Sequence, residues 1–254
     1  MSSYFLSLPL NFNQTITDTS DDALSGPVGN MIDGVQDTFW SMDASTGNVR
    51  FNLGTNSVTF DAYFIIAQNL GGYTASGLTA QSAPMTVDRQ AASRDSIQYA
   101  FHTIMAQSNT MADFNWTSRI DNSTPLRIYE FWILKQLLNV SDDQGYRQID
   151  QSLSYRGARI QEALDGTRTR TRPLGNSGKW SVAYEMNVLE NFESRIQLIN
   201  NVFFENPNFT HVVDYPTHPD RIYRAHLLGE GVEYNYISSF TGSGSTARFT
   251  IEEQ

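Results

Sequence analysis

The sequence of 254 residues contains no cysteine. This absence excludes a disulfide framework, a zinc site built on thiolates and a cysteine nucleophile. Lysine is also scarce, because only Lys135 and Lys179 supply it and the other 15 basic residues are arginine. With 27 acidic residues the formal net charge is −10. Because a phosphate backbone recruits dense Lys and Arg, we expect no nucleic-acid partner.

Long apolar runs are missing as well. No stretch approaches the roughly 18 apolar residues that cross a bilayer, so we expect no membrane span. The first ten residues lack a basic segment and are interrupted by Pro9. They therefore predict a first strand rather than a signal peptide.

Motifs of catalysis are absent too. The sequence has no phosphate-cradling glycine loop and no Gly-x-Ser-x-Gly elbow. His211, Asp214 and His218 lie close in sequence, but their spacing matches no standard zinc pattern. We predict that the protein is not an enzyme and requires no cofactor. A carboxylate pair of the glycosidase type stays open, because 27 acidic residues always contain some pair.

What is present favours β-structure in the first half. Apolar residues make up 40% of the chain and aromatic residues 12%, enough for a real core. Short apolar runs such as 49–53 and 60–67 alternate with turns rich in Gly, Asn and Asp, as in a sandwich or jelly roll. Residues 93–107 fit a strand or a helix, and we favour a strand. Residues 126–138 predict one closing strand.

The second half predicts a smaller α+β domain. Residues 139–145 are polar and turn-rich, so we divide the chain into domains 1–140 and 141–254. Apolar residues recur at three- and four-residue steps over 188–205, which predicts one main helix after a capping box at Asn187 and Glu190. A Gly/Ser linker at 241–245 precedes an expected C-terminal strand, which folds back or pairs with a neighbouring subunit.

The first half resembles a known family. The run Ile32-Asp33-Gly34, then Asp37-Thr38 and Phe39-Trp40, is similar to the opening of discoidin domains, also called factor 5/8 C-type or galactose-binding-like domains. The strand ending in Asn52-Leu53-Gly54 and a late strand containing Glu130 follow in the family's order. The resemblance spans residues 10–138 and implies an eight-stranded jelly-roll β-sandwich.

The same resemblance implies a structural calcium. Many members hold Ca²⁺ at the Asp-Gly turn, and the matching oxygens here belong to Asp33, Asp37, Thr38 and Glu130. Hard oxygen ligands suit this ion. The alternative from the residues alone is that Asp33 and Asp37 cap a turn by hydrogen bonding to nearby amides.

Glycan binding is also implied by the resemblance. Lectin-like members bind on loops with exposed aromatic and basic residues, and Tyr73, Trp116 and Arg119 are available here. Nothing in the sequence groups these three residues, and a fold does not determine a function.

The second half resembles small tail and baseplate proteins of tailed bacteriophages. The pieces are the stretch with alternating Arg168, Arg170 and Arg172, a Trp180-containing strand, the predicted helix and Val213 to Pro216. Alternating residues of a strand point to one face. That face is either solvated or an interface that pairs with carboxylates of an adjacent subunit in a ring.

These features give a leading hypothesis and one alternative. The leading hypothesis is a non-enzymatic structural subunit of a bacteriophage tail, baseplate or neck, made in the host cytoplasm. It docks into a homo-oligomeric ring with other tail proteins. The alternative is a carbohydrate-binding adhesion module that recognises a host surface glycan.

Overall fold

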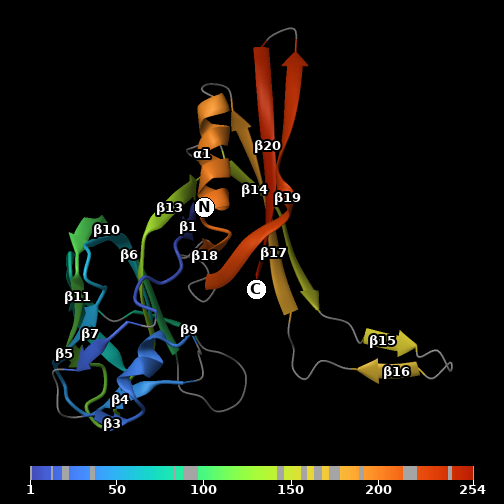
Figure 1. The fold of residues 1–254 in the computed structure, drawn as a ribbon. Helices are drawn as coiled ribbons and strands as arrows, with labels where there is room; N and C mark the ends of the chain where they lie inside the picture. The colour runs from blue at the N-terminus through green and yellow to red at the C-terminus, as the bar shows by residue number, and fades with distance from the viewer. Residues whose placement is uncertain are drawn as a thin grey trace. The chain divides into compact units, whose positions relative to one another are not determined.

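Strands dominate the protein, and one α-helix lies among the described residues (Figure 1). The predicted mainly β fold class is therefore confirmed. The computed structural model describes residues 2–12, 14–18, 23–34, 38–82, 84–87, 97–141, 146–155, 159–162, 168–171, 178–188, 192–213, 222–239 and 242–253. None of the helices in these ranges is long and apolar enough to cross a membrane.

The chain forms two compact units. The sandwich unit comprises Ser3–Leu137 and Val212–Ile222, and the helix unit comprises Met1–Ser2, Leu138–His211 and Tyr223–Gln254. The sequence predicts a single division after residue 140. In the structure Val212–Ile222, which follow that division, belong to the sandwich unit. Strands β1 (Ser2–Leu6), β13 (Gln136–Ser141) and β18 (Asn208–Val213) lie where the chain passes from one unit to the other.

Two antiparallel sheets build the sandwich unit. The six-stranded sheet has the order β3 (Ala23–Ser25), β4 (Trp40–Met42), β12 (Leu126–Leu134), β6 (Val58–Gln68), β10 (Ile97–Asn109) and β9 (Met85–Val87). The five-stranded sheet has the order β2 (Ile16–Asp18), β5 (Gly47–Asn52), β11 (Met111–Arg119), β7 (Leu70–Ala75) and β8 (Leu78–Ser82). A 3₁₀-helix, η1, spans Val28–Ile32.

The strand count corrects the eight strands implied by the resemblance. Three strands of three residues each, β2, β3 and β9, lie at sheet edges and account for the difference. Very short edge strands are a common device against edge-to-edge pairing, because they present few unpaired backbone groups.

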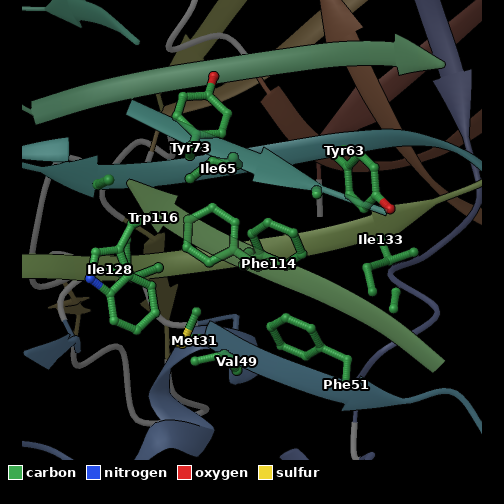
Figure 2. Packing of buried hydrophobic residues seen from close by; sticks show 14 of the residues in the cluster. Met31, Val49, Phe51, Tyr63, Ile65, Tyr73, Phe114, Trp116, Ile128 and Ile133 are labelled. Atoms are coloured by element: carbon green, nitrogen blue, oxygen red, sulfur yellow. The ribbon is translucent and has the colours of Figure 1, made fainter. Parts of the chain in front are cut away.

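Aromatic side chains fill the space between the two sheets (Figure 2). Phe131 of the six-stranded sheet packs on Phe51 and Phe114 of the five-stranded sheet, with ring centroids 4.9 and 4.7 Å apart. Trp40 meets Trp116 edge to face at 5.7 Å. Each fully buried apolar side chain of this size contributes about 1.5–3 kcal/mol, so this core holds the two sheets together.

The central strand β6 is buried on both faces. Tyr63 and Ile65 face the core between the sheets, whereas Phe64 and Ile66 belong to a second apolar cluster. On this second face, Tyr99 and Trp132 of the neighbouring strands β10 and β12 lie in the same cluster. The cluster also includes Leu6 from the N-terminal segment and Val212 and Ile222 from the returning segment. The near-continuous apolar run in β6 follows from this double burial, because a strand with one solvated face alternates instead.

Most strands of the first half match the sequence prediction. The run 49–53 lies in β5 except for its last residue, the run 60–67 lies in β6, and the described part of 93–107 lies in β10. The prediction of a single closing strand over 126–138 is wrong, because β12 ends at Leu134 and a second strand, β13, begins at Gln136. Between them Lys135 exchanges hydrogen bonds with Ser7, which offers both its backbone N–H and its hydroxyl oxygen.

The helix unit contains a sheet with neighbours β14 (Tyr146–Tyr155), β17 (Gly178–Val188), β20 (Gly242–Glu253) and β19 (Ile222–Ser239). Strands β15 (Arg159–Glu162) and β16 (Arg168–Thr171) form a separate two-stranded sheet. The helix α1 spans Phe192–Glu205. In the core of this unit, Phe203 packs on Phe209 and Phe249, and Tyr184 stacks on Phe249.

Two predictions for the second half are corrected. The helix begins at Phe192 rather than 188, and Asn187 lies in β17, so Asn187 does not cap the helix. Gly242 to Ser245 are not a linker, because they belong to β20 and pair with β19. The C-terminal strand therefore pairs within its own chain, between β17 and β19.

Candidate functional site: a loop cluster around Arg119

Arg119, the last residue of β11, connects two loops of the sandwich unit. Its guanidinium forms an ion pair with Asp43 in the β4–β5 connection, with 2.7 Å between Nη1 and Oδ1. The same group donates to the carbonyl oxygens of Asn122 at 2.9 Å and Thr124 at 3.2 Å. The Arg119 side chain is only 7% exposed, whereas that of Asp43 is 63% exposed. The guanidinium is therefore held in one position with an accessible carboxylate beside it.

Asn69 also holds the loop between β11 and β12. It lies between β6 and β7 with a φ of 64°, a conformation that Asn tolerates better than most residues. Its side-chain NH₂ group donates to the backbone carbonyl oxygens of Asp121 and Thr124, and its side-chain Oδ1 accepts the N–H of Asp121 at 2.7 Å. The turn between β6 and β7 thus anchors the loop between β11 and β12.

Asp121 organises the loop from within. Its carboxylate accepts hydrogen bonds from the N–H of Ser123 at 2.8 Å and from the hydroxyls of Ser123 and Thr124. These bonds, above all the one from the Ser123 N–H, lower the pKa of Asp121. The loop consequently carries an ionised carboxylate at neutral pH. We call Asp43, Asn69, Arg119 and residues 121–124 the loop cluster.

Arg127 links Gln68, the residue before Asn69, to the aromatic ring of Phe39. Arg127 donates to the Gln68 side-chain oxygen at 3.1 Å, and its guanidinium carbon stands 4.9 Å from the centroid of the Phe39 ring. Phe39 is partly exposed and meets Tyr129 edge to face at 5.6 Å. A cation over a ring face is attracted by the ring quadrupole, so Phe39 and Arg127 hold one another.

This arrangement suits recognition of a polar ligand. Loops supported by a rigid scaffold commonly carry binding residues, and the three loops here are joined by hydrogen bonds before any ligand arrives. Arg supplies donors, Asp supplies acceptors, and Asn and Ser supply both. Because these groups are already ordered, a ligand loses little affinity to their immobilisation.

Two of the three predicted glycan-binding residues are not available. Tyr73 and Trp116 are each 1% exposed and lie in the core between the sheets (Figure 2). The Tyr73 hydroxyl shares a hydrogen bond with His102 Nε2 at 2.6 Å. The prediction that they form an exposed surface is therefore wrong. Successive side chains of a strand point to opposite faces of the sheet. The polar neighbours Asn115 of Trp116 and Thr74 of Tyr73 were therefore the sequence signal that both aromatic side chains point inward.

Arg119 is the predicted residue that lies next to a loop, although its own side chain is only 7% exposed. Sequence reasoning did not identify its partners Asp43, Asn69 and Asp121. Asn69-Leu-Gly-Gly and Asp121-Asn-Ser-Thr are turn-forming sequences and could have indicated the two loops, but only the sandwich brings them together.

The structure describes three of the four predicted calcium ligands. The Thr38 hydroxyl donates to Asp33 Oδ2 at 2.6 Å, so these two residues do meet. Glu130 is fully buried, and its Oε2 accepts the indole N–H of Trp132 at 2.6 Å. Asp37 lies outside the described residues. Among the described residues no group of three or more His, Cys, Asp or Glu side chains is placed to hold a metal ion. Calcium binding stays a prediction.

The predicted arginine interface falls in the separate two-stranded sheet. Arg168 and Arg170 lie in β16, which confirms that this stretch is extended, and Arg172 lies outside the described residues. Whether these residues form an interface between subunits stays a prediction.

Comparison with known proteins gives a likeness of fold only. No family model and no curated protein matches the chain. Among solved structures, chitosan-binding module 1 of a chitosanase/glucanase from Paenibacillus sp. IK-5 is 16% identical, covering 49% of this chain and 97% of the module, with a TM-score of 0.37. The CBM32-4 module of Clostridium perfringens GH89, solved with GlcNAc-α-1,4-galactose, is 12% identical, covering 50% and 94%, with a TM-score of 0.37.

Proposed function

We propose that the sandwich unit is a non-enzymatic carbohydrate-binding module and that its sugar contacts the loop cluster. The observation that carries the proposal is the exposed Asp43 carboxylate, which the buried Arg119 guanidinium holds in place while it also donates to the carbonyl oxygens of Asn122 and Thr124. A neutral sugar presents many hydroxyls, each a donor and an acceptor. Ordered planar groups of both kinds match such a ligand.

The charge of the chain supports a neutral ligand rather than a polyanion. The net charge of −10 repels polyanions at long range, whereas hydroxyl groups are indifferent to it. Within the loop cluster, Asp43 and Asp121 outnumber the one arginine. The resemblance to discoidin domains over residues 10–138, a family with glycan-binding members, points in the same direction.

A glycan array with the full-length protein tests the proposal. We expect one class of neutral oligosaccharide to bind and calorimetry to confirm it in solution. Asp43→Asn should weaken that binding by about tenfold or more, because hydrogen bonds to charged groups are worth about 1.5–3 kcal/mol. Arg119→Gln should weaken it as well, because it releases Asp43 and the loop at residues 121–124.

The matched control is the ion pair between Arg50 and Asp113 on the five-stranded sheet, which has the same 2.7 Å separation. Arg50→Gln and Asp113→Asn should leave sugar binding unchanged. An array without a ligand would overturn the proposed function. Sugar binding that is insensitive to Arg119 and Asp43 would show that the site lies elsewhere on the protein.

A structural role in a bacteriophage tail stays the competing prediction, together with a location in the virion. Neither the fold nor the comparisons bear on it. The two functions are compatible in one chain, because the loop cluster belongs to the sandwich unit and the arginine-rich strands belong to the helix unit.

A further inference from the structure

Strands β14 and β17 enclose an insertion that their pairing does not require. The two strands pair antiparallel to their ends, where Tyr155 lies opposite Gly178. A turn of two residues closes such a pair. The chain instead inserts residues 156–177 at this point. Hairpin loops usually have two to five residues, and much longer insertions in compact domains are commonly functional.

The insertion carries its own small sheet. Its described residues form β15 and β16, and these two strands pair only with each other among the described strands. A two-stranded hairpin without further support is marginally stable in water. Residues 156–177 contain no aromatic residue with which to build a core of their own. Contact with another surface would supply the missing support.

The charge of the insertion is opposite to that of the chain. It holds five arginines, no lysine and two acidic residues, whereas the remainder of the chain holds 12 basic and 25 acidic residues. In the register of the ribbon, Glu162 lies opposite Arg168, but Ile160 lies opposite Arg170 and Thr171 lies opposite Arg159. Two of the three described arginines therefore have no carboxylate directly across from them.

We propose that the β15–β16 ribbon docks onto an acidic surface of a second copy of this chain. Outside the insertion a second copy carries 25 acidic and 12 basic residues, so its charge there is opposite to that of the insertion. Arginine pairs with carboxylates through two parallel hydrogen bonds, which favours it over lysine in such contacts. Single-stranded nucleic acid fits less well, because the ribbon has no aromatic ring for base stacking and the chain is acidic. This inference is independent of sugar binding.

Sedimentation of the full-length protein over a range of concentrations, at about 50 mM and about 500 mM salt, tests the proposal. We expect self-association at low salt that weakens at high salt. Replacing residues 156–177 by Asn-Gly should abolish it, since the register at Tyr155 and Gly178 accepts a two-residue turn. Arg168→Gln with Arg170→Gln should weaken it by about tenfold.

The control is Arg50→Gln with Lys135→Gln, which removes the same charge from two exposed residues of the sandwich unit. This variant should associate like the wild type. A wild-type monomer at every concentration, or unchanged association of the two ribbon variants, would overturn the proposal. So would ribbon-dependent binding of a single-stranded oligonucleotide by a protein that stays monomeric. The variant lacking 156–177 should still bind sugar, so failure of one proposal is distinguishable from failure of the other.

Discussion

The side chain of Gln98 hydrogen-bonds the backbone of Leu70 in the way a neighbouring strand would. Its Oε1 accepts the Leu70 N–H at 2.7 Å, and its Nε2 donates to the Leu70 carbonyl oxygen at 2.9 Å. Gln98 lies in β10 of the six-stranded sheet, whereas Leu70 begins β7 of the five-stranded sheet. Both residues are buried. This pair therefore joins the two sheets directly beside Asn69, at the base of the loop cluster.

Replacing Gln98 should destabilise the whole sandwich. Gln98→Leu removes both partners from buried backbone groups, and each such group costs about 1–3 kcal/mol. We expect the free energy of unfolding, measured with urea, to fall by about 2–4 kcal/mol. Gln81, whose side chain donates to the nearby Thr79 carbonyl in an exposed hydrogen bond, is the control. Equal losses for Gln81→Leu and Gln98→Leu would contradict the bridging role.

Gly47 should tolerate no side chain, because Trp116 occupies the space. A Cβ at Gly47 would lie 1.9 Å from Trp116 Cζ2. We expect Gly47→Ala to lower the free energy of unfolding by about 1–3 kcal/mol and to change the tryptophan fluorescence of the folded protein. Gly29 has nothing within 4 Å of such an atom, so Gly29→Ala should change stability by less than about 0.5 kcal/mol.

Asn69 should matter both for its backbone and for its side chain. Asn69→Gly removes the amide contacts but accepts the φ of 64°, whereas Asn69→Ala loses the contacts and adds left-handed strain. We expect Asn69→Ala to be about 1 kcal/mol less stable than Asn69→Gly in chemical denaturation. Both variants should weaken sugar binding, because both release residues 121–124. Equal stabilities would show that the conformation at residue 69 relaxes without cost.

His211 should make stability depend on pH. It is buried, lies 2.7 Å from the Tyr184 hydroxyl, and burial lowers its pKa to about 3. Its ordinary pKa is about 6.5, so the unfolded chain takes up a proton first as the pH falls. The stabilisation is therefore present above pH 6.5 and is lost progressively down to about pH 3.

Comparison with His211→Gln isolates this effect. Between pH 6.5 and pH 5 the wild type should lose about 1.5 kcal/mol more of its unfolding free energy than the variant loses. Urea titrations of both proteins at these two pH values measure the difference. Parallel losses in the two proteins would mean that His211 titrates normally in the folded state.

Calcium binding is testable by melting the full-length protein with and without a chelator. An ion bound to the native state alone raises the melting temperature, and its removal lowers it. We expect a lower melting temperature after chelation and recovery with added Ca²⁺. Asp33→Asn should remove the response. A melting temperature that the chelator leaves unchanged would leave Asp33 and Thr38 as a simple turn contact.

Local sequence determined most strands and the helix, because their signals are periodicities of apolar residues over neighbouring positions. Runs such as 60–67 predict strands wherever they lie, and Ile199 and Phe203 mark the buried side of the helix. The alternation of polar and apolar residues along β11 also indicates that the Trp116 side chain points inward. The lack of cysteine and the acidic charge needed no structure at all.

Tertiary structure alone decided which residues meet. The contacts of Asn69 with Asp121 and of Arg119 with Asp43 join loops far apart in sequence, and no local pattern carries such a pairing. The sequence also does not predict that Val212 and Ile222 belong to the sandwich unit, because burial of a second sheet face depends on a distant segment that covers it. Periodicity shows that a residue is buried, but only the packed fold shows against what.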